Sequence, residues 1–216
     1  MKTKVKICCI SSVDEARLAI KAGATELGLV GPMPSGPGII SETQIAEIVK
    51  AVPQNINTFL LTSELSAAKI IEQHNKVKTT SIQIVDKLES GTYNDIRSAI
   101  PNIKLVQVIH VIDENSIVEA QNVAPNVDYI LLDSGNPNKE IKELGGTGRI
   151  HNWNLSKMIV DSISTPVFLA GGLKSTNIRE AITTVRPHGV DLCSSVRYNG
   201  KLDPGKLCTF FDNVHP

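Results

Sequence analysis

Asp128-Tyr129-Ile130-Leu131-Leu132-Asp133-Ser134, followed by Gly145-Gly146-Thr147-Gly148, is the stretch that indicates the fold. A short apolar run ends at the carboxylate of Asp133, and a glycine-rich loop comes after it. A buried parallel strand presents an acid at its C-terminal end in this way, and glycines let the backbone approach a ligand closely. A carboxylate that leaves an apolar strand is costly unless it is paired or used. Asp133 is therefore either the cap of a turn or a functional acid, and we favour the functional acid.

The same strand-then-helix pattern recurs about eight times along the chain. The expected strands cover residues 4–9, 26–30, 56–61, 81–85, 103–111, 129–132, 166–170 and 190–193. They are continuous apolar runs, which is typical of a parallel sheet covered by helices. In a chain of 216 residues, this number of units predicts one α/β domain over residues 1–216, a (β/α)8 TIM barrel. An open doubly wound sheet is the alternative, because a count of helices does not prove closure.

The composition excludes several classes of partner. Lys+Arg and Asp+Glu balance at 22 each, so no overall field attracts nucleic acid or a membrane surface. The N-terminus lacks the apolar segment of a signal peptide, and no run reaches membrane-spanning length. The four cysteines, at positions 8, 9, 193 and 208, fit neither a disulfide framework nor zinc spacing. We therefore expect free thiols, no metal and a cytoplasmic location.

The first strand ends in Cys8 and Cys9. Because side chains alternate along a strand, Lys6 and Cys8 should share one face, with Cys8 at the mouth of the barrel, and Cys9 should take the other face. A nearby cation and partial exposure favour a thiolate, which suits a base or a nucleophile. The alternative is that Cys8 is an inert small apolar residue.

Small residues follow the last two strands, namely Gly171 and Gly172 after one, and Ser194 and Ser195 after the other. In a TIM barrel these two loops are the usual phosphate site, because their backbone N–H groups are free to bind an anion. A simple turn explains one Gly-Gly pair equally well, but both loops together favour phosphate.

Two arginines lie beside candidate ligand loops, and two histidines lie in or after other strands. Arg149 and Arg197 are candidate ligand contacts, although exposed arginines are usually solvated. The five histidines show no metal spacing, and we expect local hydrogen bonds for most of them. Of these, His110 could face the barrel mouth and His151 could contact its rim.

Several segments together resemble the phosphoribosylanthranilate isomerase family over essentially the whole chain. They are Lys6-Ile7-Cys8, residues 129–134, 145–148 with Trp153, 169–173, and 185–187 leading to 189–191. The resemblance implies that Cys8 is the general base and Asp133 the general acid. It also implies that the glycines of the last three units, among them Gly146, bind the ribose phosphate of a small-molecule phosphorylated sugar. No cofactor is implied, and the protein would be a monomer or a homodimer.

The sequence departs from the family pattern at four places. Cys9 stands where the family usually has glycine, Gly38 where it has the arginine that binds the anthranilate carboxylate, and Val85 where it has a histidine. The last motif, usually Ser-Ser-Gly-Val-Glu, reads Cys-Ser-Ser-Val-Arg over residues 193–197. Arg149 and Arg197 are then the candidates for the carboxylate, and Gly38→Arg is expected to keep or improve activity.

The function expected from the resemblance is the Amadori rearrangement of N-(5-phosphoribosyl)anthranilate to 1-(2-carboxyphenylamino)-1-deoxyribulose 5-phosphate in tryptophan biosynthesis. Two alternatives stay open at this point. One is an isomerase-like paralogue that acts on another phosphorylated sugar or amine. The other is a catalytically silent barrel that binds a phosphorylated ligand.

Overall fold

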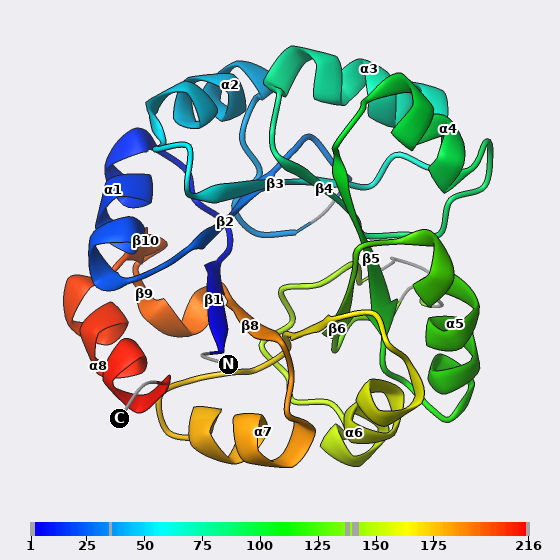
Figure 1. The fold of residues 1–216 in the computed structure, drawn as a ribbon. Coiled ribbons are helices and arrows are strands. Elements are labelled where there is room, and N and C mark those ends of the chain that lie inside the picture. Colours follow the sequence, from blue (N-terminus) through cyan, green and yellow to red (C-terminus); the bar gives the residue numbers. More distant parts are fainter. Residues whose placement is uncertain (1–2, 35, 137–138, 140–142, 215–216) are drawn as a thin grey trace.

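The first and last strands of the sheet pair with each other and close it (Figure 1). The computed structural model of the protein describes residues 3–34, 36–136, 139 and 143–214. Its eight parallel strands form a closed barrel in the order of the sequence. Strand β1 pairs with β2 on one side and with β8 on the other, where Lys6 lies opposite Asp191 and Ile7 opposite Leu192. The closure confirms the predicted TIM barrel and excludes the open sheet.

Strands and helices alternate along the whole chain, and the helices form the outer ring in Figure 1. The barrel strands are β1 (Lys4–Ile7), β2 (Glu26–Val30), β3 (Asn57–Thr62), β4 (Ser81–Ile84), β5 (Lys104–His110), β6 (Tyr129–Asp133), β7 (Val167–Leu169) and β8 (Gly189–Leu192). The α-helices are α1 (Val13–Ala22), α2 (Glu42–Ala51), α3 (Ala67–Val77), α4 (Tyr93–Ala99), α5 (Asn115–Val123), α6 (Trp153–Ser162), α7 (Ile178–Val185) and α8 (Pro204–Val214). Short 3-10 helices are η1 (Ala124–Asn126) and η2 (Ser194–Val196).

Helix α1 shows how local sequence sets these boundaries. The Ser12 hydroxyl accepts a hydrogen bond from the backbone N–H of Glu15 at 3.2 Å, which caps the start of the helix. The helix ends at Gly23, whose φ of 117° is left-handed and whose N–H bonds back to the last turn. Serine and glycine are the residues that these two cap positions favour.

A small hairpin after β8 is an element that the sequence analysis missed. Strands β9 (Arg197–Tyr198) and β10 (Lys201–Leu202) are antiparallel and are joined by Asn199 and Gly200. Both turn residues have positive φ, 48° and 79°. Asn-Gly is the most favoured two-residue hairpin turn, so the signal was present in the sequence. The hairpin places Arg197 beside the end of β1.

Alternation along the strands divides the apolar residues into two clusters. One lies between the strands and the helices, and in β1 it takes Val5 and Ile7. The other fills the barrel interior, where Phe59 and Phe168 meet edge to face with ring centroids 6.1 Å apart. Within the described ranges, no helix combines the length and the apolar character needed to cross a bilayer.

A buried ion pair joins the two strands that close the barrel. The ammonium of Lys6 is fully buried and lies 3.0 Å from the carboxylate of Asp191. It also lies 5.4 Å from the centroid of the Phe59 ring, which adds a cation–π contact. Burial works against the charged form of Lys6, but the neighbouring Asp191 outweighs it and raises the pKa of Lys6. The register between β1 and β8 therefore places Asp191 where it compensates the charge of Lys6.

We predict that Lys6→Met destabilises the barrel by about 3–5 kcal/mol, because it leaves the Asp191 carboxylate buried without its partner. The double variant Lys6→Met with Asp191→Leu should recover most of that loss, since it removes both charges. Equilibrium denaturation in urea measures both values. A single variant as stable as the wild type would contradict this account of the pair.

Candidate active site

The C-terminal ends of the strands surround a pocket of about 800 Å3, including its space open to solvent. Its walls hold both residues that the sequence analysis assigned to catalysis, Cys8 at the end of β1 and Asp133 at the end of β6. The residues predicted to bind phosphate line the same pocket: Gly146, Gly171, Gly172, Ser194 and Ser195. The fold thus brings together seven candidates that come from four strand ends.

Cys8 lies directly above the buried lysine, as alternation along β1 predicts. A Cβ on Gly28 of β2 would lie 2.7 Å from the Cys8 sulfur and 3.1 Å from the Lys6 nitrogen, so the two atoms are neighbours. Its surroundings favour the neutral thiol, however, and not the thiolate that the sequence predicts. Burial raises the pKa of Cys8 to about 11, and the attraction of Lys6 offsets only part of this effect. With 6% of its surface exposed, the thiol is less hydrated than the sequence analysis assumed.

Cys9 corrects two further expectations. Strand β1 ends at Ile7, and Cys9 adopts a left-handed φ of 61°, so strand alternation no longer decides which way its side chain points. Cys9 therefore lines the pocket together with Cys8. Its sulfur is joined in a disulfide to that of Cys193, which follows β8. The expected set of free thiols is thus wrong for this pair, whereas Cys8 and Cys208 are free.

Asp133 is fixed by the backbone that follows it. One carboxylate oxygen accepts the N–H of Ser134 at 2.7 Å. The glycine loop passes over the other oxygen so closely that a Cβ on Gly145 would stand 2.7 Å from it. The Ser134 hydroxyl in turn lies 2.7 Å from that of Thr147 and ties the loop to the strand end. The loop can pack against the acid only because Gly145 has no side chain.

Hydrogen bonds from one side chain hold the loop after β7 in place. The side-chain amide of Asn177 donates to the Gly172 carbonyl at 3.0 Å, and its oxygen accepts the N–H of Lys174 at 2.9 Å. Gly171 and Gly172 both have positive φ, 80° and 63°. A Cβ on Gly172 would meet backbone atoms of residues 149 and 150 at 2.8 Å, so this loop and the β6 loop pack against each other.

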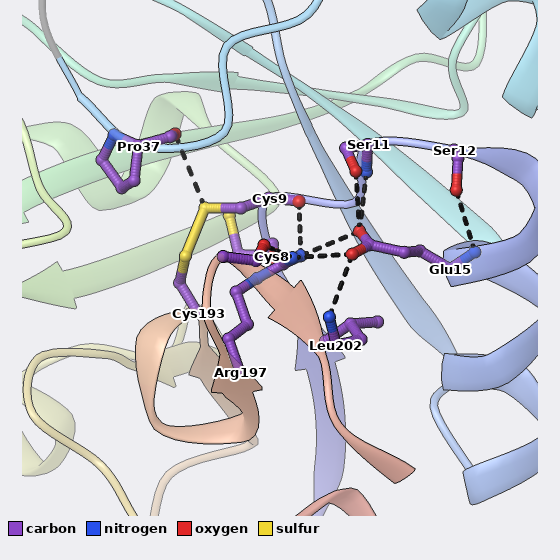
Figure 2. A network of polar contacts seen from close by, with 10 residues as sticks. Cys8, Cys9, Ser11, Ser12, Glu15, Pro37, Cys193, Arg197 and Leu202 are labelled. Carbon is purple, nitrogen blue, oxygen red and sulfur yellow. Dashed lines mark hydrogen bonds and ion pairs between the residues drawn. A yellow bond between two sulfur atoms is a disulfide. The ribbon is translucent and has the colours of Figure 1, made fainter.

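Arg197 holds the end of β1 from outside the pocket (Figure 2). Its guanidinium donates to Glu15 at 2.9 and 3.1 Å and also to the backbone carbonyls of Cys8 and Cys9. Burial acts to raise the pKa of Glu15, but hydrogen bonds from Arg197, Leu202 and Ser11 outweigh it and lower the pKa. The guanidinium thus makes its hydrogen bonds within the protein. This arrangement does not support the predicted contact with a substrate carboxylate.

Arg149 and the two histidines also lie away from the pocket wall. Arg149 pairs with Glu143 on the loop surface. His110 donates to the Val85 carbonyl at 3.2 Å, and His151 bonds to Ser156 at 2.7 Å. Among the described residues that line the pocket, none is Lys, Arg or His.

Gly38 and Cys9 occupy adjoining space. A Cβ on Gly38 would stand 2.4 Å from the Cβ of Cys9 and 3.1 Å from its sulfur. Gly38 also has a positive φ of 73°. A residue larger than glycine at position 38 would therefore meet both a steric clash and an unfavourable backbone conformation. The clash arises because the side chain of Cys9 occupies the adjoining space.

The sequence analysis missed Asp191 as a pocket residue. It lines the pocket and keeps one buried carboxylate oxygen without a hydrogen bond. The signal was available, since Asp191 interrupts an apolar strand as Asp133 does. In the part of the chain that the structure describes, no three His, Cys, Asp or Glu side chains are grouped as metal ligands.

Comparison with known proteins agrees with this geometry. The family model of N-(5'-phosphoribosyl)anthranilate isomerase matches residues 5–213. N-(5'-phosphoribosyl)anthranilate isomerase 1 of Methanosarcina mazei is 32% identical, over 99% of this chain and 95% of that protein. The crystal structure of phosphoribosyl anthranilate isomerase from Thermotoga maritima is 26% identical, with a TM-score of 0.80 over 98% of both chains.

A further crystal structure of phosphoribosyl anthranilate isomerase holds reduced 1-(o-carboxyphenylamino)-1-deoxyribulose 5-phosphate. It is 24% identical with a TM-score of 0.78 over 98% of both chains, and at that identity it supports the fold alone. The family model matches nearly the whole barrel, and this match is the evidence for the family. The chain belongs to the N-(5'-phosphoribosyl)anthranilate isomerase family.

Proposed function

We propose that the chain performs the family's reaction, an Amadori rearrangement in tryptophan biosynthesis, with Asp133 as the general acid and Cys8 as the general base. One observation carries this assignment of roles. A carboxyl group and a thiol from non-adjacent strands, β6 and β1, line one pocket whose rim is built from the loops after β6, β7 and β8. The reaction needs an acid and a base at different atoms of one substrate, and this arrangement supplies both.

Asp133 acts on the furanose ring. It gives a proton to the ring oxygen as the bond from that oxygen to C1′ breaks, and the nitrogen lone pair forms the C1′–N double bond of an iminium ion. The buried position of Asp133, which is 9% exposed, keeps this proton transfer out of bulk water. The substrate nitrogen is the electron sink, so the step requires no cofactor.

Cys8 acts on the iminium ion. Its thiolate removes the hydrogen of C2′, the C–H electrons form the C1′–C2′ double bond, and the nitrogen recovers its lone pair. The resulting enol becomes the ketone of the product as its C2′ hydroxyl loses a proton and C1′ gains one, so no atoms are gained or lost overall. Because burial raises the pKa of Cys8 to about 11, thiolate is scarce at neutral pH, but each thiolate is a strong base.

The two ends of the pocket suit the two ends of the substrate. Glycine and serine loops after β6, β7 and β8 offer backbone N–H groups to the phosphate. Apolar side chains cover the wall where the aromatic ring would lie: Val30, Met33, Leu61, Val85, Val108 and Leu131. Contact of Arg149 or Arg197 with the carboxylate stays a prediction, and it requires the arginine to leave its ion pair. The oligomeric state, monomer or homodimer, also stays a prediction.

The catalytic pair is tested by Cys8→Ser and Asp133→Asn, each of which should lower kcat on phosphoribosylanthranilate by at least ~10²-fold. The reason is that each substitution removes one proton transfer while it keeps the size of the side chain. Steady-state kinetics measure the effect. Wild-type rates at background level would reject the proposed function, and near-normal turnover by both variants would reject the assigned roles.

The pH profile is the control for the role of Cys8. With a thiol pKa of about 11, kcat/KM of the wild type should rise with pH from about pH 6 to pH 9, by up to tenfold per unit. The value of kcat/KM rises with pH because only the deprotonated thiol of Cys8 can act as a base. Asp133→Asn should keep this alkaline rise at a lower level, whereas Cys8→Ser should lose it.

The phosphate site is tested at Ser194, which is exposed at the pocket rim. Ser194→Asp should raise KM by about tenfold or more, because a carboxylate about 4 Å from a phosphate repels it by about 1–4 kcal/mol. Ser194→Asn is the matched neutral control and should stay close to wild type. Equal KM values for the Asp and Asn variants would place the phosphate elsewhere.

The structure reverses the expectation for Gly38→Arg. The new side chain would clash with Cys9 and would sit at a positive φ, so we expect a loss of stability of about 1–3 kcal/mol or more instead of a gain of activity. Cys9→Gly should relieve most of the clash, because it removes the Cβ at 2.4 Å and the sulfur at 3.1 Å and leaves the Cα of residue 9 at 3.0 Å. A double-mutant cycle under reducing conditions should therefore show favourable coupling between the two substitutions.

Gly36→Arg is the control for this cycle. It lies in the same loop with a positive φ of 127°, but its nearest neighbour, the Met33 sulfur, is 3.7 Å from the added Cβ. It should show the backbone cost without coupling to position 9. Equal coupling at positions 36 and 38 would contradict the steric explanation.

A further inference from the structure

We propose that Cys9 and Cys193 form a reversible thiol–disulfide modification site that controls phosphate binding in the pocket. The two cysteines are 184 positions apart in sequence, but they follow β1 and β8, which are neighbours in the closed barrel. Their Cα atoms are 5.9 Å apart, within the range that a disulfide spans. Both residues line the pocket, so the bond forms part of its wall.

The position of the pair connects it to both parts of the proposed mechanism. Cys9 directly follows Cys8, the proposed base, and Cys193 directly precedes Ser194 and Ser195 of the phosphate site. A bond between them therefore ties the residue that carries the base to the loop that holds the phosphate. The consequence for binding rests on the proposed function; the formation of the bond does not.

The sulfur of Cys9 has a second partner, which only the reduced form can use. It lies 3.6 Å from the carbonyl oxygen of Pro37, a distance at which a thiol donates a hydrogen bond (Figure 2). A disulfide sulfur has no proton to donate. Reduction therefore moves the attachment of Cys9 from the loop after β8 to the loop after β2. Both loops line the pocket.

The backbone around Cys9 is held in both states. Arg197 donates to the carbonyls of Cys8 and Cys9 and is itself fixed by Glu15 (Figure 2). Because this clamp does not involve sulfur, a change of redox state leaves the base in place. The segment released on reduction is the one that begins at Cys193 and leads into the phosphate site.

A small disulfide can oxidise the Cys9–Cys193 pair, and a dithiol can reduce it. Oxidation removes two electrons and two protons from the thiols of Cys9 and Cys193 and forms the S–S bond. Oxidised glutathione accepts them and becomes two molecules of glutathione, while dithiothreitol reverses the step. Cys193 is half-buried at the pocket wall, which leaves it within reach of a small thiol.

Thiol counting and kinetics together test the proposal. The protein is equilibrated in oxidised glutathione or in dithiothreitol, then denatured and alkylated with N-ethylmaleimide for mass spectrometry. We expect alkylation of only Cys8 and Cys208 after oxidation and of all four cysteines after reduction. The KM for phosphoribosylanthranilate and the Kd of inorganic phosphate should both rise about 3- to 10-fold on reduction, with a smaller change in kcat. Reoxidation should reverse the change.

Two variants separate this site from other thiol effects. Cys193→Ser should have the reduced-form KM in both buffers. Cys208→Ser, on the exposed face of α8, should respond like the wild type. Four alkylated cysteines in every buffer would overturn the proposal, and so would a disulfide that forms without changing KM or phosphate affinity. Failure of the proposed function gives a different result. Turnover then stays at background in both buffers, while the number of alkylated cysteines still changes from two after oxidation to four after reduction.

Discussion

The pairing of β1 with β8 is the constraint on which the rest of the structure depends. It aligns Lys6 with Asp191 and lets the N–H of Cys8 donate to the Leu192 carbonyl at 2.7 Å. The disulfide and the contacts of Arg197 with the end of β1 cross the same seam. The proposed base, the cation beneath it and one wall of the proposed phosphate site are therefore assembled by closure of the barrel and by no local motif.

Burial at this seam has opposite effects on the Lys6–Asp191 ion pair and on the proposed base, Cys8. A dry interior strengthens the attraction between Lys6 and Asp191 and holds the strand ends in register. The same dryness favours the neutral thiol of Cys8, and Lys6 compensates only in part because Asp191 already neutralises it. If Cys8 is the base, as proposed, its geometry is fixed by the seam while only a small fraction of the thiol is ionised at neutral pH.

How far the sequence predicts this molecule depends on the range of each interaction. The apolar strands and the glycine loops are local signals, and they predicted the barrel and the pocket-lining residues that follow its strands. The partners of Cys9 and Arg197 depend on contacts across more than 180 positions, which only topology and register determine. The protonation of Cys8 required its degree of burial, and the orientation of Cys9 required knowing that β1 ends two residues earlier. The Asn199-Gly200 hairpin, in contrast, was a local signal that could have been used.

Positions 9 and 38 show why departures from a family pattern should be considered together. Taken singly, Cys9 adds bulk beside the base, and Gly38 loses a side chain from another loop. In space they are one feature, because a Cβ on residue 38 would lie only 2.4 Å from the Cβ of Cys9. A larger residue at position 9 thus requires glycine at position 38, and an arginine at 38 requires glycine at 9. Glycine at position 38 thus fits both the Cys9 side chain and the positive φ of 73° at that position, and the proposed redox pair lies directly against the loop where the sequence departs from the expected arginine.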